Sequence, residues 1–382
     1  MNIEQRHWSD NTGWSVPSGH SLIADAQLVL AFGGRAVLEE KARYDEIRAM
    51  YPNAHILLSS TSGEILGTGV YDDTIAVTAV SFERTTLKLV SSEITSIDHS
   101  YQTGKELADA FEKEGLVHVF VISDGQRVNG SAFVKGLNDG LPAHVSVTGG
   151  LAGDGSLFQR TVVGLNAYPA EGKIAAIGFY GPDLTVTYGS FGGWDSFGPE
   201  RLITKSKNNV LYELDGQSAL DLYKKYLGEQ SAGLPGTALL FPLSISTGGD
   251  VPVVRTILSI DEQNKSMTFA GDMPEGMYAR LMKANVERLI DGASRAAVNS
   301  AVPMRQQQAE LAILISCVGR KLVLGQRIEE EVEGVREVFG TGTALTGFYS
   351  YGEISPFTNA AQCELHNQTM TVTAFSERNV RE

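Results

Sequence analysis

The chain has 382 residues, of which 42% are hydrophobic and 20% are charged, a composition typical of a folded globular protein and not of a disordered or fibrous one. Its formal net charge of −14, without any cluster of Lys and Arg, argues against nucleic acid as a partner because phosphate would be repelled. The polar start, the short apolar runs and the presence of only two cysteines predict a cytoplasmic protein without a secretion signal or membrane insertion.

The first predicted unit follows a polar tail that we assign to residues 1–25. A short apolar run stopped by glycines, "AQLVLAFGG", predicts a buried strand, and a helix with one charged face follows over 38–50. Pro52 ends that helix. Two further strands, "AHILLSS" and "TIAVTAVSF", flank a Gly-Glu-Ile turn that contains Glu64.

The same order of elements occurs twice more. "HVFVIS", a weak helix near 131–140 and "AHVSVTGG" form a second unit, whose turn "LAGDG" contains Asp154. "ELAILIS", a helix around "GQRIEEEVEGVREVFG" and "ALTGFYSYGEI" open a third, which contains Glu353 and ends with the strand "HNQTMTVTAF". An acidic residue beside a glycine in each turn favours an internal repeat.

A junction between modules is predicted in "VLYELDGQSALDLYKKYLG", where a turn precedes an amphipathic helix. The sequence therefore predicts an α/β fold of two related modules, over 26–213 and 214–382, each a mixed β-sheet covered by helices. A helix over about 276–300 with several methionines and leucines is interpreted as core packing without chemistry.

Two loops that follow buried strands are the first candidates for a ligand site. "VISDGQR" and "LISCVGR" both end a strand with Ile-Ser, and both place an arginine, Arg127 or Arg320, four residues after the serine. Ligands of α/β proteins bind at the carboxyl ends of strands, where an arginine holds a carboxylate well. The alternative is that each arginine forms an ion pair with Glu64, Asp154 or Glu353 in the scaffold.

The sequence has no Walker A loop, HExxH, GxSxG or dinucleotide-binding glycine motif, so we expect no enzyme. Cys317 lies just before a predicted helix whose dipole would lower a thiol pKa, which leaves a thiol-dependent enzyme as an alternative. A buried, inert thiol is the simpler interpretation.

Three histidines each lie at the start of a predicted strand: His55, His144 and His366. A neutral imidazole is a common ligand of haem iron, so each is a candidate haem ligand. The alternative is an ordinary hydrogen-bonding histidine at a strand edge.

Six segments together resemble, in order, the FIST family of bacterial sensory proteins: "SSTSGEI", "VTGGLAGDG", "VLYELDGQSALDLYKKYLG", "ISCVGRKLVLG", "FYSYGEISP" and "ELHNQTMTVTAF". The resemblance runs from about residue 28 to about residue 375, with an amino-terminal and a carboxyl-terminal FIST module. It implies an intracellular module that binds a small ligand and signals to a separate protein such as a histidine kinase, without catalysis. Amino acids have been proposed as ligands of the family, and a stand-alone subgroup binds haem, senses nitric oxide and regulates a histidine kinase.

The resemblance also implies that the Gly-Glu-Ile turns and the Ser-Cys-x-Gly-Arg loop face the ligand. We expect the ligand, amino-acid-like or haem with nitric oxide, to be held between Arg320 and Glu353 and to shift the arrangement of the two modules. The complete set of predicted ligand-binding residues is Glu64, Arg127, Ser316, Cys317, Arg320, Gly352 and Glu353.

Overall fold

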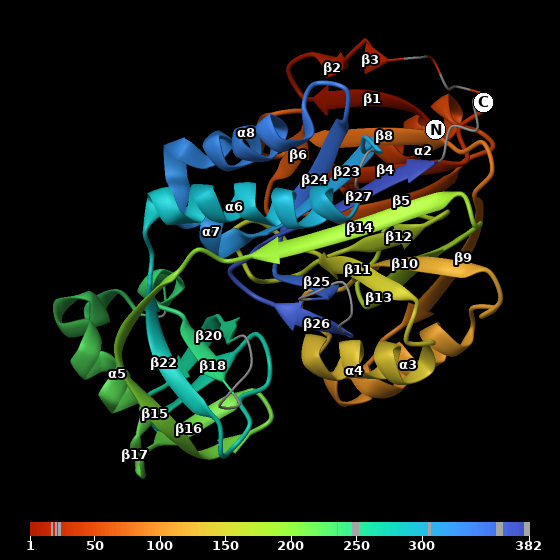
Figure 1. The fold of residues 1–382 in the computed structure, drawn as a ribbon. Helices are drawn as coiled ribbons and strands as arrows, with labels where there is room; N and C mark the ends of the chain where they lie inside the picture. Colours follow the sequence, from red (N-terminus) through yellow and green to blue (C-terminus); the bar gives the residue numbers. More distant parts are fainter. Residues whose placement is uncertain are drawn as a thin grey trace.

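Three copies of one unit form the core of the protein, which is seen in the computed structural model in Figure 1. The structure describes the chain except residues 17, 20, 22–23, 235, 247–251, 305–306, 357–361 and 378–382. Each unit has two parallel strands joined through a helix, and a third strand antiparallel to the first. The first unit comprises β4 (Leu28–Gly33), α2 (Lys41–Met50), β5 (His55–Ser60) and β8 (Ile75–Ser81). The second comprises β10 (Leu116–Ser123), α4 (Gly130–Gly140), β11 (Ser146–Leu151) and β13 (Lys173–Tyr180). The third comprises β23 (Leu311–Cys317), α8 (Ile328–Phe339), β24 (Ala344–Ser350) and β27 (Met370–Glu377).

The units exchange edge strands in a cycle. The first unit supplies β6 (Glu64–Leu66) to β24, the second supplies β12 (Val163–Leu165) to β5, and the third supplies β25 (Gly352–Pro356) to β11, all antiparallel. Each exchanged strand lies in sequence between the second and third strands of its own unit. Each unit is therefore paired with both of the others, which links the three units in a cycle.

Further strands extend the three sheets, and further helices belong to the core. The antiparallel outer strands are β1 (Asn2–Ser9) on β8, β9 (Thr86–Glu93) on β13 and β14 (Leu184–Phe191) on β27. Short strands extend the edges: β2 (Gly13–Trp14), β3 (Ser18–Gly19), β7 (Gly69–Tyr71) and β26 (Cys363–His366). The other core helices are α1 (Arg35–Leu38), α3 (Ser100–Asp109), α6 (Val286–Ala301) and α7 (Val318–Leu324).

The central core lies where the inner faces of the three sheets meet. It contains Phe32 from the first unit, Phe120 and Ile122 from the second, and Ile315 and Phe348 from the third, all almost fully buried. The outer faces pack against α2, against α3 and α4, and against α6 and α8. Because both faces are covered, these strands are nearly continuous hydrophobic runs, which is why the sequence predicts them well.

A separate β-rich lobe is inserted between β14 and α6, and it lies to one side of the core in green and cyan (Figure 1). It has its own hydrophobic core beneath α5 (Ala219–Leu227). Its other main elements are β15 (Asp195–Lys207), β16 (Val210–Leu214), β17 (Gln217–Ser218), β18 (Leu243–Ser246), β19 (Val253–Arg255), β20 (Ile257–Asp261), β21 (Ser266–Phe269), β22 (Tyr278–Lys283) and the 3₁₀ helix η3 (Gly236–Leu240).

The mixed α/β fold with helix-covered sheets and internal repeats is confirmed, and the core contains the three repeated units. The predicted junction between residues 213 and 214 lies within β16, inside the inserted lobe.

Two local predictions are corrected. Residues 2–9, assigned to a polar tail, form β1, where the buried Glu4 carboxylate is bonded by Tyr51 Oη at 2.8 Å. The helix predicted over 276–300 begins only at Val286, where the Asn285 side chain accepts the backbone N–H of Arg288. The residues before it form β22, which pairs with β15 and β18.

No helix in the described parts of the chain has the length and apolar character needed to cross a membrane.

Candidate functional site

A cavity of about 440 Å³ opens where loops from all three units meet, and we call it the polar cleft. Its walls come from loops or helices that follow β4, β5, β11 and β23, with one further loop leading into β8. The lining residues are Gly34, Arg35, Ala36, Thr61, Ser62, Gly63, Glu64, Asp72, Asp73, Asp154, Gly155, Ser156, Leu157, Val318, Lys321 and Leu322. Carboxyl ends of strands are the usual place for a ligand in an α/β fold.

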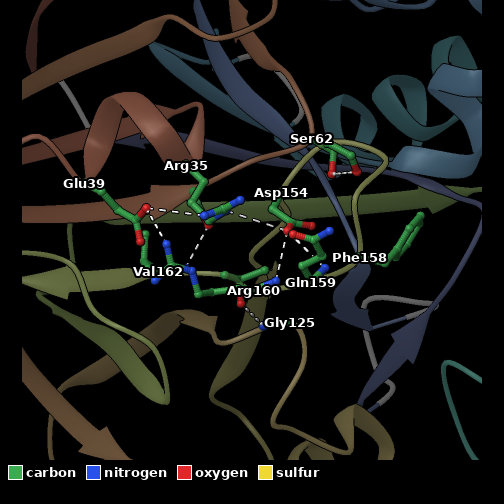
Figure 2. A network of polar contacts seen from close by, with 12 residues as sticks. Arg35, Glu39, Ser62, Gly125, Asp154, Phe158, Gln159, Arg160 and Val162 are labelled. Atoms are coloured by element: carbon green, nitrogen blue, oxygen red, sulfur yellow. Dashed lines mark hydrogen bonds and ion pairs between the residues drawn. The ribbon is translucent and has the colours of Figure 1, made fainter.

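Arg35 is the main cation of the polar cleft. Its Nε lies 3.7 Å from Asp154 Oδ2, and its Nη1 donates to Glu39 Oε2 at 3.4 Å (Figure 2). The side chain is only 17% exposed, yet within the described residues its buried Nε has no hydrogen-bond partner. A buried donor without a partner is unfavourable. Arg35 therefore has donor capacity left for an anion bound in the cleft.

Lys321 is the second cation. Its Nζ donates to the backbone oxygen of Ser62 at 2.8 Å, forms an ion pair with Asp72, and lies 5.5 Å from the centre of the Tyr349 ring. The Lys321 side chain is 16% exposed, whereas that of Asp72 is 68% exposed. The amine is thus fixed at the cleft wall, while its carboxylate partner can reorient in solvent.

Asp154 fixes the loop that separates β11 from β12. Its buried carboxylate accepts the backbone N–H groups of Gln159 at 3.1 Å and Arg160 at 2.9 Å, and it also accepts the hydroxyl of Tyr351. Figure 2 shows Arg35 and the loop residues converging on this carboxylate. Arg160 in turn bonds Glu39 at 2.8 Å, so the loop and the carboxyl-terminal end of α1 are connected.

Glu64 lies in the wall of the polar cleft but is held by the scaffold. Its carboxylate accepts the N–H of Thr74 at 3.1 Å and its hydroxyl at 2.7 Å, together with the hydroxyl of Thr61. Burial raises the pKa of Glu64 to about 7, although these hydrogen bonds oppose the shift. Glu64 is the one predicted ligand-binding residue that lines the cleft.

Arg320, predicted to hold the ligand, is a structural residue. It is fully buried and donates to Glu331 Oε2 from Nε at 3.1 Å and from Nη2 at 2.7 Å. It also donates to the backbone oxygens of Gly192 and Leu289. The scaffold-pairing alternative is therefore correct for Arg320, although the partner is Glu331 and not one of the acids considered from the sequence.

Arg127 also lies outside the cleft. Its side chain is 50% exposed and pairs with Glu171 at 2.6 Å. The Ile-Ser pattern predicts equivalent positions for Arg127 and Arg320, but their surroundings differ, since Arg320 is buried and Arg127 faces solvent.

Arg35 is not among the residues predicted from the sequence. The sequence signal that could have identified it is its position directly after "AFGG", where a buried strand ends.

Ser316 and Cys317 point into the scaffold. The Ser316 hydroxyl donates to Glu331 Oε1 at 3.0 Å, and the Cys317 side chain is almost fully buried. Burial raises the pKa of the Cys317 thiol far above its ordinary value, so the predicted dipole effect does not dominate. Neither residue lines the polar cleft.

Glu353 and Gly352 are also buried in the scaffold, on the exchanged strand β25. Glu353 accepts the N–H of Thr369 at 3.1 Å and its hydroxyl at 2.8 Å, together with the hydroxyl of Ser350 at 2.8 Å. Burial raises the pKa of Glu353 to about 8. Its position matches that of Glu64 on β6, whereas Asp154 lies in a loop before β12 and is not an equivalent third acid.

The three candidate haem ligands do not converge on a site. His55 and His144 are exposed near the amino-terminal ends of β5 and β11, opposite the strand ends that form the polar cleft. His366 is buried with Nε2 at 2.7 Å from Ser355 O, and burial lowers its pKa to about 4. None of them lines the polar cleft, so the residues present do not fit an axially ligated haem there. In the described parts of the chain, no cluster of His, Cys, Asp and Glu is suited to a metal ion.

Comparisons with known proteins identify two family domains. Residues 27–217 match the model of the FIST N domain, and residues 219–356 match that of the FIST C domain. No curated protein matches the chain. Among solved structures, one described as a "cyanuic acid hydrolase from A. caulinodans" aligns at 8% identity with a TM-score of 0.32, over 93% of this chain and 91% of that chain. A similarity at this level supports no argument about fold or function.

Proposed function

Because the chain belongs to the FIST family, whose domains are sensory and bind small ligands, we propose that it senses an amino-acid-like ligand in the polar cleft. It then signals to a separate protein such as a histidine kinase. The observation that carries this proposal is the Arg35 guanidinium, which lines the cleft with a buried Nε that has no hydrogen-bond partner among the described residues.

The charges of the cleft suit a zwitterion. Arg35 and Lys321 present positive groups for a carboxylate, and the planar guanidinium of Arg35 matches the two carboxylate oxygens. Asp72 and Asp73, both exposed in the loop before β8, present negative groups for an ammonium. A ligand with charges of both signs would therefore find complementary groups within one cavity.

The signal would be a change in conformational population. The cleft is lined by all three units, so a ligand that contacts Arg35, Ser156 and Lys321 bridges a segment of each unit. Preferential binding to one arrangement of these segments increases its population and changes the surface offered to a partner. Catalysis is not part of the proposal. The Cys317 thiol is buried outside the cleft, and the Glu64 and Asp154 carboxylates that line it accept hydrogen bonds from the scaffold.

Calorimetric titration with the natural amino acids tests the proposal. Arg35→Gln should weaken binding about tenfold to hundredfold, because it removes a charged hydrogen-bond donor. Arg127→Gln is the matched control, since Arg127 is exposed and outside the cleft, and it should bind as wild type. If no amino acid binds, or if Arg35→Gln binds as tightly as wild type, the polar cleft is not the site.

A further inference from the structure

A second cavity of about 530 Å³ lies between the inserted lobe and the core, and we call it the apolar cavity. From the lobe, η3 contributes Leu239 and Leu240, and β20 contributes Ile257 and Leu258. The core contributes Phe158 from the loop after β11. The remaining lining residues are Ser156, Gly236, Thr237 and Leu322.

The apolar cavity adjoins the polar cleft. Ser156 and Leu322 line both cavities, so the two spaces share a wall that is made by the loop after β11 and by α7. Each cavity alone falls within the size range of small-molecule sites. The two cavities are therefore neighbours at Ser156 and Leu322, and a ligand that occupied both would pass these two residues.

Exposed leucines mark this boundary. Leu157 at the polar cleft is 56% exposed, Leu322 at the shared wall is 45% exposed, and Leu258 at the apolar cavity is 44% exposed. Single exposed leucines are common on protein surfaces, but three at the rims of adjoining cavities indicate apolar area that another group would cover.

We infer that the ligand is an amino-acid compound with a large apolar side chain, which occupies the apolar cavity while its charged head binds in the polar cleft. This inference rests on the proposed function, because the head group is the one assigned above to Arg35. The polar cleft supplies the charges, and the apolar cavity supplies selection by side-chain size and hydrophobicity.

The position of the apolar cavity gives such a ligand a contact with the lobe. The side chain would touch Leu258 of the lobe and Phe158 of the core. Other contacts between the lobe and the core include two hydrogen bonds, from Arg255 Nη1 to Leu365 O at 2.9 Å and from Asn129 Nδ2 to Asp272 Oδ1 at 3.0 Å. They also include an apolar cluster in which Met282 of the lobe packs with Leu289 and Leu324. The apolar side chain is therefore the part of the ligand whose contacts depend on the position of the lobe.

Titration of the full chain with glycine, alanine, leucine, phenylalanine and tryptophan tests the inference. Phenylalanine or tryptophan should bind at least about tenfold more tightly than alanine, because a hydrophobic pocket discriminates by side-chain size. Leu258→Gln and Leu322→Gln should each remove most of this preference. Alanine binding should change little in Leu258→Gln, because Leu258 lines the apolar cavity and not the polar cleft. Val298→Gln is the control, since Val298 has the same 44% exposure on α6 and lines neither cavity.

The outcomes separate the two proposals. If all five amino acids bind equally and Arg35→Gln still weakens them, the apolar subsite is wrong and the proposed function stands. If the leucine variants keep the wild-type preference, the side chain binds elsewhere and the inference is wrong. Absence of binding by the whole series overturns both.

Discussion

Glu64 and Glu353 occupy equivalent positions on two exchanged strands and make the same contacts. Each carboxylate accepts both the backbone N–H and the hydroxyl of the threonine that directly precedes the last strand of its own unit, Thr74 or Thr369. The repeated Gly-Glu-Ile sequence is therefore a structural connection: it joins an exchanged strand to the start of the next strand. Its acids are buried because they satisfy backbone groups that would otherwise be unpaired.

The stability of the protein should fall as pH rises from about 5 to about 8. Burial raises the pKa of Glu64 to about 7 and of Glu353 to about 8, above the ordinary value of 4.5 that the unfolded chain retains. The folded protein thus holds protons that the unfolded chain releases, and this stabilisation is lost as pH rises through the folded-state values. In Glu353→Gln, the fall in the free energy of unfolding between about pH 5 and about pH 8 should be smaller than in the wild type by at least about 1 kcal/mol.

Chemical denaturation at a series of pH values measures this slope. Glu337→Gln on the exposed side of α8 is the control for the loss of one surface carboxylate. Parallel curves for wild type and Glu353→Gln would show that Glu353 titrates alike in the folded and unfolded states.

Arg320→Ala should reduce the free energy of unfolding by about 3–5 kcal/mol, because it leaves the buried Glu331 carboxylate without its cation. The control is Arg327→Ala, which breaks the exposed ion pairs with Glu330 and Glu287 and should have a much smaller effect. Urea denaturation followed by circular dichroism gives both values. Equal, small effects of the two substitutions would contradict the scaffold role of Arg320.

The thiol of Cys317 should react slowly with an aromatic disulfide reagent in the native protein. It is 2% exposed, and burial raises its pKa, so little thiolate is accessible at pH 8. Cys363→Ser isolates Cys317, and the rate should rise to that of a free thiol in denaturant. A fast native reaction would restore the thiol-enzyme alternative.

Gly149→Ala and Gly347→Ala should each destabilise the protein by at least about 2 kcal/mol. Both glycines have positive φ, +153° and +159°, and an added Cβ would overlap the carbonyl oxygen of Val121 or Leu314 on the neighbouring parallel strand. Gly67→Ala is the comparison, since its φ is +62° but a Cβ there meets no atom within 4 Å. Thermal melts should rank Gly67→Ala as the mildest, and a different order would mean that the strands shift to accommodate the methyl group.

The sequence by itself predicted most elements of the three units to within a few residues. Strands such as β4 and β23 are apolar runs buried on both faces, and glycines or polar residues stop them, so the signal is local. The predicted helix over 325–340 corresponds to α8 and a preceding 3₁₀ turn, since its apolar stripe also repeats locally. The family resemblance likewise depends on short segments in order, which the two domain matches support.

The tertiary structure decided which of the similar strand-end residues face a cavity. Arg35, Arg127 and Arg320 all follow buried strands, but only Arg35 lines the polar cleft. The difference comes from distant partners: Glu331 holds Arg320 inside the scaffold, and Glu171 holds Arg127 at the surface. The cyclic exchange of edge strands brings such distant residues together, and the local sequence does not specify which strand pairs with which, because strand pairing depends on contacts between units.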